Sequence, residues 1–492
     1  AALETADIHA WNTAQMAALS TRSLAAFDGS QLAALTTTQA AALSAAQAAA
    51  IDAGDLSTMG TANLAALSTA AVQALSTAQL GGIEADQLAK LTTAQVAALD
   101  ATQVAGLSAA SLAALGTAQF AALGTAQIAA ITTAQAVDME SADLAALSSA
   151  QLRAISADAL AQVTPEALAA LAATKVATLT TAQIAALTAN QVAGLDTDDV
   201  AALTTAQLSA LSPAQFAAFT NEQLAVLGTG QVLGWSTASI ASLTPAALAA
   251  LSTAQFAAMS TAQIAAITSE QAGSLETADV AALSANQVKA LSAAAVGNLS
   301  ADAVAALGTA QFAALSTAQL AALGVDAMAA IQTRDLVTLG TAQIAALSTV
   351  QLDALDTAQL AALTSRQVAA LSTAQFASIQ ADELAAMGTA QFVAMTSDQL
   401  AALTSDQAAA LQSADVAALS VAQIRALTPD TVANLSDSVI AGLTTQQVGA
   451  LSNLQLAQMS DAQIAAMETR DVAALGLPQV AALSQSQLQA MG

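Results

Sequence analysis

The sequence has no cysteine and no tyrosine, a single histidine and only 2% aromatic residues. Without cysteine there is no disulfide scaffold or thiol enzyme, and one histidine cannot build a Cys₂His₂ zinc site or a histidine-based triad. Charged residues make up 9% of the chain, against roughly 25% in ordinary soluble domains. Nine basic residues face 35 acidic ones, a net charge of −26, which argues against nucleic acid and anionic membrane surfaces as partners.

Long apolar runs are missing as well. Hydrophobic residues account for 56% of the 492 residues, but serine, threonine, glutamine or aspartate interrupts them every few positions. No stretch reaches the ~18 consecutive apolar residues that a membrane-spanning helix needs. We therefore predict that the chain contains no membrane span.

What the sequence does contain is one unbroken repeat of eight residues. With Leu3 as position 1, every eighth residue as far as Met491 is apolar, which gives 61 complete repeats without an insertion or deletion. The consensus is Leu-Ser/Thr-Thr-Ala-Gln-Ile/Val/Leu-Ala-Ala. Position 6 is also always apolar, and positions 1 and 6 together hold all eight phenylalanines, both tryptophans and all ten methionines. We expect these two positions to form the core of a single continuous repeat domain over residues 1–492.

Each repeat carries the signals that start a helix. Position 2 is mostly serine, threonine, aspartate or glycine, and position 5 is usually glutamine, so the two form a capping box. Position 3 then becomes the first helical residue, where proline is favoured, and Pro165, Pro213, Pro245 and Pro429 all stand there. Positions 1 and 6 match the two members of a hydrophobic staple. The repeat thus predicts a short capped helix of about six residues that begins at position 3.

Two other architectures fit the pattern poorly. In one continuous helix, eight residues advance the apolar pair by about 80° per repeat, so no stripe would persist. A β-solenoid would need alternating apolar residues rich in valine, isoleucine and threonine, whereas alanine and glutamine dominate here. An isolated six-residue helix is unstable in water, so the helices must bury positions 1 and 6 against neighbours. We predict an all-α solenoid of about 61 short helices, coiled into an elongated superhelical rod.

Positions 4, 7 and 8 form an alanine-rich face opposite the predicted core. Charges occur at these positions, for example at His9, Arg22 and Lys90, and never at positions 1 and 6. The face is therefore expected to be at least partly exposed. Short uncharged side chains suit close packing against another copy, so we expect self-association through this face; the alternative is that alanine there only favours the helix.

No residue pattern indicates a catalytic, cofactor-binding or metal-binding site. His9 has no partner residues and fits a solvated surface position. The densest acidic segment, Asp196 to Asp199, fits a helix cap with first-turn acids, and a calcium site there is the alternative. The methionines fit core positions better than a cofactor box. We therefore expect a protein that is not an enzyme.

The octads Leu-Ser-Thr-Ala-Gln and Leu-Thr-Thr-Ala-Gln resemble tracts in very large, repetitive secreted surface proteins of proteobacteria, which are adhesin-like or filament-like. The resemblance covers the whole chain. It implies an extracellular or cell-surface location in a bacterium, and it transfers no functional residue.

Together these observations predict a structural protein: a stiff rod that serves as filament subunit, sheath component or stalk. The alternative function is a binding surface, in which serine and threonine at positions 2 and 3 present periodic hydroxyls to polysaccharide, ice or a partner protein. Polar capping repeats are not evident at Leu3 or Met491, so we expect residues 1–492 to be a window of a longer array.

Overall fold

A computed structural model describes residues 3–491 as a succession of short α-helices, with no strand among those residues. It contains 61 helices over this range, from α1 (Thr5–Ala10) to α61 (Gln485–Ala490), each four to six residues long. Helix number n begins at residue 8n − 3, which is position 3 of its repeat. The predicted register is thereby confirmed along the whole described chain.

Two extended residues separate successive helices. In α32 (Thr253–Ala258), the N-cap Ser252 has φ −74° and ψ 153°, and the following Met259 has φ −61° and ψ 142°. The Ser252 hydroxyl accepts a hydrogen bond from the Gln255 backbone N–H, while the Gln255 Oε1 accepts one from the Ser252 N–H at 2.7 Å. No described residue has a positive φ, so the chain turns at positions 1 and 2 without needing glycine.

Some helices are shorter than the six residues that the sequence predicts. In α2 (Thr13–Ala17), the residue after the helix, Ala18, keeps right-handed helical angles of φ −81° and ψ −8°. Its N–H bonds the Ala14 carbonyl oxygen at 3.1 Å, so the difference is one residue in where the helix end is placed. Four prolines occupy the first helical position, as predicted, and Pro478 is the second residue of α60 (Leu477–Ala481).

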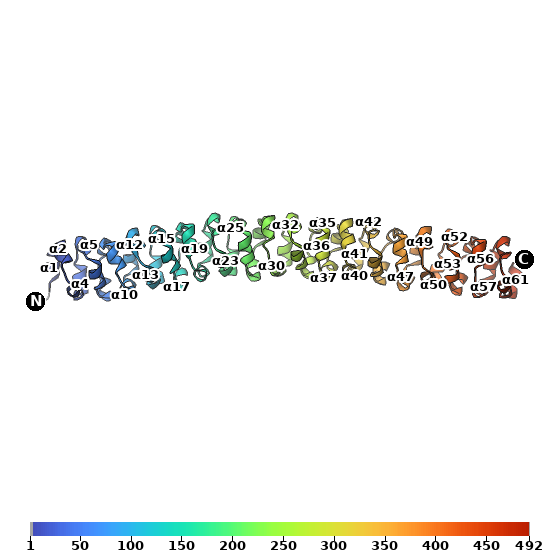
Figure 1. Cartoon of the computed structure of the whole chain (residues 1–492), viewed down its shortest axis with the longest axis horizontal. Coiled ribbons are helices and arrows are strands. Elements are labelled where there is room, and N and C mark those ends of the chain that lie inside the picture. The colour runs from blue at the N-terminus through green and yellow to red at the C-terminus, as the bar shows by residue number, and fades with distance from the viewer. Residues whose placement is uncertain (1–2, 492) are drawn as a thin grey trace. The chain divides into compact units, whose positions relative to one another are not determined.

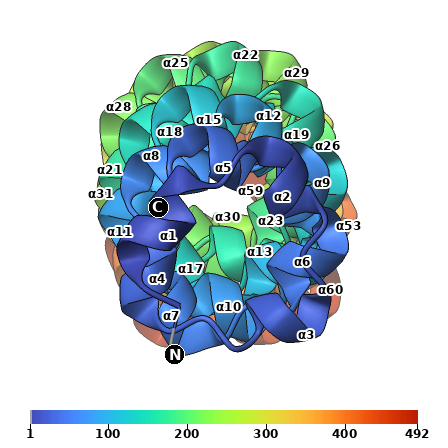
Figure 2. The ribbon, with the colours of Figure 1, turned by 90° about the vertical axis from the view of Figure 1, so that its left-hand side faces the viewer.

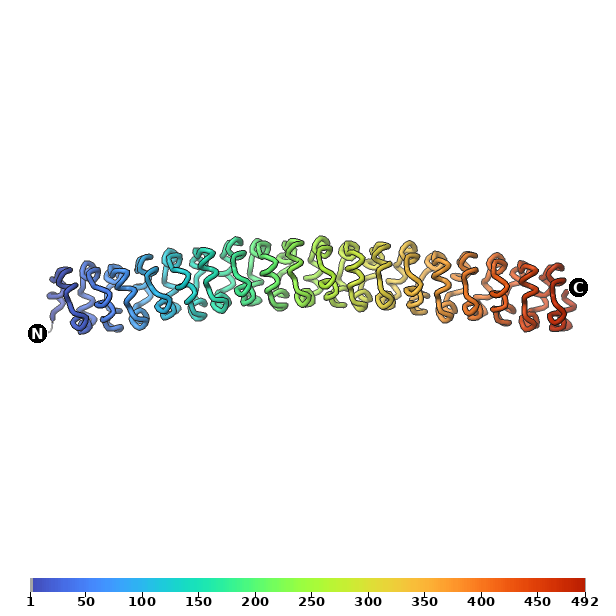
Figure 3. The backbone as a smooth tube through the Cα atoms, in the orientation of Figure 1, coloured from blue at the N-terminus to red at the C-terminus, as the bar shows by residue number. Residues whose placement is uncertain are grey.

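The chain divides into two compact units, residues 1–243 and 244–492. The first contains α1 to α30 (Thr237–Ser242), and the second contains α31 (Pro245–Ala249) to α61. Within each unit a helix packs against the third helix along the chain, as α5 (Thr37–Ala41) does against α8 (Thr61–Ala66). The chain therefore winds in each unit as a solenoid-like stack, and we call one turn of this path a coil (Figures 2 and 3).

Positions 1 and 6 supply the core, as predicted. Ile264 in α33 (Thr261–Ala265) is 0% exposed, whereas its neighbour Ala265 at position 7 is exposed. Near the end of the described chain, where no further coil follows, Val480 and Leu488 at position 6 are 41% and 47% exposed. Burial of these side chains is therefore supplied by adjacent coils rather than by the helix itself.

A pair of substitutions tests this assignment of faces. Ile264→Asp places a carboxylate among apolar side chains and should destabilise the surrounding coils by about 4 kcal/mol or more. Ala265→Asp, one residue on, should change stability by less than about 1 kcal/mol because the side chain meets solvent. Urea unfolding and hydrogen exchange of the full chain measure both effects, and equal losses in the two variants would contradict the assignment.

Candidate functional site

The most repeated polar feature of the molecule is a buried glutamine at position 5. Gln399 in α50 (Ser397–Ala401) is 1% exposed, and its Oε1 accepts a hydrogen bond of 2.8 Å from the Thr396 N–H. Its Nε2 donates to the backbone carbonyls of Val368 and Leu371, both at 2.8 Å. These carbonyls lie 31 and 28 residues earlier in the chain. We call this arrangement a glutamine bridge, since one amide closes its own helix cap and binds the preceding coil.

Val368 belongs to α46 (Ser365–Ala369), the fourth helix before α50. Because each helix packs on the third helix before it and its glutamine bonds the fourth, one coil contains between three and four helices. The same bridges occur in the first unit, where Gln135 donates to Val104 and Leu107 at 2.8 Å each.

The bridge explains why glutamine is preferred at position 5. The position 1 carbonyl stands in extended backbone at a buried place, and an unpaired buried carbonyl costs about 1–3 kcal/mol. Glutamate could close the cap but has no N–H to give to this carbonyl. Sequence reasoning identified the glutamine only as a capping-box residue. The signal it missed is that the cap uses Oε1 alone, which leaves two amide protons that need acceptors in a buried place.

Seven repeats replace this glutamine by an acid that is at most 7% exposed: Asp143, Asp199, Asp279, Asp335, Glu383, Asp415 and Asp471. Four of these aspartates accept a hydrogen bond of 2.7–2.9 Å from a threonine hydroxyl 26 residues earlier; the donors are Thr253, Thr309, Thr389 and Thr445. An ionised carboxylate has no proton to donate. At these four repeats the preceding coil therefore supplies the donor and the acid accepts. The bond that a glutamine would donate to the position 1 carbonyl is lost.

Burial raises the pKa of several of these carboxyls because it disfavours the charged form. The pKa of Asp199 rises to about 6, mainly through burial, with the charges of Asp196 and Asp198 adding to the shift and a backbone hydrogen bond opposing it. Burial also raises the pKa of Asp143 and Asp279, each partly offset by a threonine hydroxyl, and that of Glu383. Asp335 and Asp471 each have a guanidinium nearby, with the Nε of Arg334 at 3.7 Å and that of Arg470 at 3.8 Å from a carboxylate oxygen.

The aspartates follow a second period in the sequence. They occur in helices seven apart, namely α18 (Ser141–Ala146) with α25 (Thr197–Ala202), α35 (Thr277–Ala282) with α42 (Thr333–Leu336), and α52 (Ser413–Ala417) with α59 (Thr469–Val472). Each such pair follows the previous one by 17 helices, or 136 residues, as from Asp279 to Asp415. Within the second unit, α35, α42 and α52 lie along one edge in Figure 1. The octad therefore carries a longer repeat that the sequence reasoning did not detect.

The residues that the sequence singled out do not converge on a common site. His9 is exposed in α1, with Nδ1 3.4 Å from the Ala34 carbonyl oxygen. Asp196 and Asp198 are exposed, whereas Asp199 is buried and pairs with Asp196 in a capping box. Over residues 3–491, no group of three or more histidine, cysteine, aspartate or glutamate side chains is placed to hold a metal ion. Asp196 is the N-cap of α25 and Asp198 and Asp199 lie in its first turn, as expected, and calcium binding by the segment stays an untested alternative.

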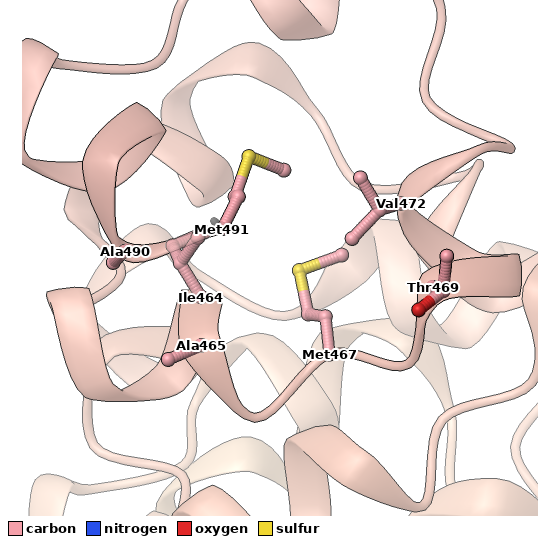
Figure 4. Close-up of a pocket in the computed structure, with 7 residues that line it drawn as sticks. All are labelled: Ile464, Ala465, Met467, Thr469, Val472, Ala490 and Met491. Atoms are coloured by element: carbon pink, nitrogen blue, oxygen red, sulfur yellow. The ribbon is translucent and has the colours of Figure 1, made fainter.

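A hollow of about 220 Å³ lies at the last coil (Figure 4). The methionines Met467 and Met491 flank it, and Ile464, Thr469 and Val472 complete much of its wall. None of its lining residues titrates, so the hollow offers no side chain for acid–base chemistry.

The protein is a helical octapeptide-repeat protein. Each repeat contributes one short helix, mostly capped, and two core residues, and at most repeats a glutamine side-chain amide donates a hydrogen bond to an earlier coil. None of the described helices is long or apolar enough to cross a membrane. The model of the ALTTAQ repeat family matches well over half of the sequence, and the chain belongs to this family. The matched residues are 1–45, 48–85, 136–173, 192–229, 240–277, 273–309, 328–365, 376–413 and 408–445. No curated protein matches the chain.

The family's motif corresponds to the parts of the repeat described above. Residues 202–207 read Ala-Leu-Thr-Thr-Ala-Gln. Leu203 is a buried core residue and Thr204 is the N-cap of α26 (Thr205–Ala210). Gln207 closes the cap with Oε1 and donates through Nε2 to the Leu179 carbonyl at 2.9 Å.

Replacing one bridging glutamine tests the energetic role of the bridge. Gln399→Glu keeps the cap acceptor but removes both donors and buries a carboxyl, so the full chain should lose about 2–3 kcal/mol near α46 and α50. Gln15 in the first coil is exposed, and among the described residues its amide bonds only its own cap, so Gln15→Glu is the matched control. Local hydrogen exchange at pH 7 reads out both variants. Similar protection in Gln399→Glu and the parent chain would refute the role of the bridge.

Proposed function

We propose that this chain is a non-catalytic structural protein, a stiff solenoid rod that serves as filament subunit, sheath component or stalk. The observation that supports this proposal is the glutamine bridge, which recurs between coils within each unit. Each added repeat brings the same pair of core residues, the same cap and the same bond to the coil before it. Length can therefore grow without a new packing problem, and stability is roughly the sum of nearest-neighbour terms.

The outer surface supports self-association of such rods. Alanine at positions 4 and 7 is mostly exposed, and it allows close approach of two backbones at little cost in side-chain entropy. Larger apolar residues also stand exposed at these positions, among them Leu233 at 62%, Val350 at 63% and Val393 at 49%. Exposed apolar side chains on a surface with few charges favour contact with another protein surface. We propose a second copy of this chain as that partner.

An extracellular or cell-surface location in a bacterium completes the proposal. The acidic, cysteine-free composition is compatible with it, and the repeat tracts that the octads resemble belong to secreted surface proteins. In this setting the rod acts as a spacer or a sheath.

Electron cryomicroscopy of the dilute purified chain tests the rod and its assembly together. With about ten ångströms between coils, the chain should form a rod very roughly 150–200 Å long, and rods should associate side by side at higher concentration. Particles that are compact, or flexible like beads on a string, would contradict the rod.

The matched variant combines Ala265→Lys, Ala313→Lys and Ala401→Lys, all at exposed position 7 sites. It should keep the helical circular dichroism of the parent chain and lose lateral association, because the lysines place like charges and long side chains in the contact. Unchanged association in this variant would mean that position 7 is not the contact surface.

A further inference from the structure

Asp199 occupies the place of a bridging glutamine without making the bridge. Its side chain is 2% exposed. The carbonyl that a glutamine would bond here is that of Leu171, 28 residues earlier, and Leu171 is 3% exposed. Among the described residues, neither a backbone nor a side-chain donor bonds the Leu171 carbonyl oxygen. A buried acceptor thus lies where the adjacent coil normally supplies an N–H.

Asn63 shows that a side chain as short as aspartate reaches this acceptor. It stands at the same repeat position in α8, is 7% exposed, and donates from Nδ2 to the Leu35 carbonyl at 2.6 Å. Leu35 also lies 28 residues earlier. Aspartic acid has the shape of asparagine, with an O–H in place of the amide N–H when it is protonated.

We propose that Asp199 is a proton-controlled joint between two coils. When the carboxyl is protonated, its O–H donates to the Leu171 carbonyl and binds the two coils as Asn63 does. When the carboxyl is ionised, the donor is lost and a charge lies close to an unpaired carbonyl oxygen, so only apolar packing holds α25 to the coil before it.

The surroundings of Asp199 contain few groups that could offset its charge. On its own helix the charged neighbours are Asp196 and Asp198, which oppose ionisation. Helix α22 (Ala173–Val176), the third before it, carries Lys175, whose ammonium donates to the Ala145 carbonyl, and α28 (Asn221–Ala225), the third after it, carries Glu222.

Glu166 lies in α21 (Pro165–Ala169), the fourth helix before α25, and is charged like Asp199. The residue 26 positions before Asp199 is Ala173, so this aspartate lacks the threonine hydroxyl that stabilises ionised Asp279. Among the six buried aspartates at this position, Asp199 is therefore the one whose ionised form has no threonine donor.

The direction of the pH effect follows from the raised pKa. Burial moves the pKa of Asp199 from 3.8 to about 6. The joint is consequently closed at pH values below about 4 and opens as the pH rises through about 6. Because each pKa unit corresponds to a tenfold change in the equilibrium, closure should weaken by at most on the order of 100-fold by pH 7.5.

Hydrogen exchange of the full chain at pH 5 and pH 7.5, corrected for intrinsic exchange rates, tests the joint. In the parent chain, peptides from α22 and α25 should lose protection by about tenfold at the higher pH, because much of the loss already occurs between pH 4 and pH 5. Asp199→Asn carries a permanent N–H donor, so it should be at least as protected as the parent chain at pH 5 and keep its protection at pH 7.5. A decline in Asp199→Asn that equals the decline in the parent chain would overturn the proposal.

The reciprocal variant, Asn63→Asp, should create a joint where none exists. Peptides from α8 should become less protected at pH 7.5 and recover part of their protection at pH 5, while those from α22 and α25 behave as in the parent chain. Protection at α8 that is independent of pH in this variant would likewise overturn the proposal, because it would show that a carboxyl at this place does not control the contact. Neither result depends on whether the chain forms filaments.

Discussion

The fold depends on how buried backbone carbonyls between very short helices find hydrogen-bond donors. A helix leaves its first four N–H groups and last four C=O groups without intrahelical partners, so a six-residue helix has few internal bonds. At most helices a capping box supplies acceptors for the first N–H groups, and the position 5 amide supplies donors to the coil before it. Position 1 must be apolar and extended at once, and at most repeats a glutamine 28 residues later bonds its buried carbonyl, as Gln399 bonds that of Leu371.

The repeats that depart from the consensus show what each part of the glutamine contributes. Asn63 keeps a donor to the preceding coil, but α8 has no capping box, so the Asn63 side chain does not accept from the N–H of the N-cap Gly60. Lys175 donates to the Ala145 carbonyl with an ammonium and follows Ala172, which cannot cap. Buried aspartates such as Asp279 do the reverse, since they accept from a threonine of the preceding coil and donate nothing when ionised. Glutamine alone combines an acceptor for its own cap with two donors for the neighbouring coil.

The sequence predicted the local structure because the signals for it lie within eight residues. Caps, first-turn prolines such as Pro213 and the staple at positions 1 and 6 all agree on one register, and the structure confirms it. The bridge from Gln399 to Leu371 could not be predicted in the same way, because it depends on how many helices complete a coil. That number is set by packing between helices three and four apart, which no local signal encodes. The 136-residue period is difficult to detect in the sequence, because the strict eight-residue repeat makes every segment of the chain resemble every other segment.

The two periods are linked by the geometry of the coil. With between three and four helices per coil, 17 helices complete more than four turns and fewer than six, and five is the whole number in that interval. A block of 17 repeats therefore brings a helix back to the same side when five coils are completed, which agrees with the common edge of α35 and α52 in the second unit (Figure 1). A block one repeat longer or shorter would rotate Asp415 away from the side on which Asp279 lies. Duplication in units of 136 residues thus preserves which side of the stack carries the buried carboxyls, and the length of the block follows from the packing of the helices.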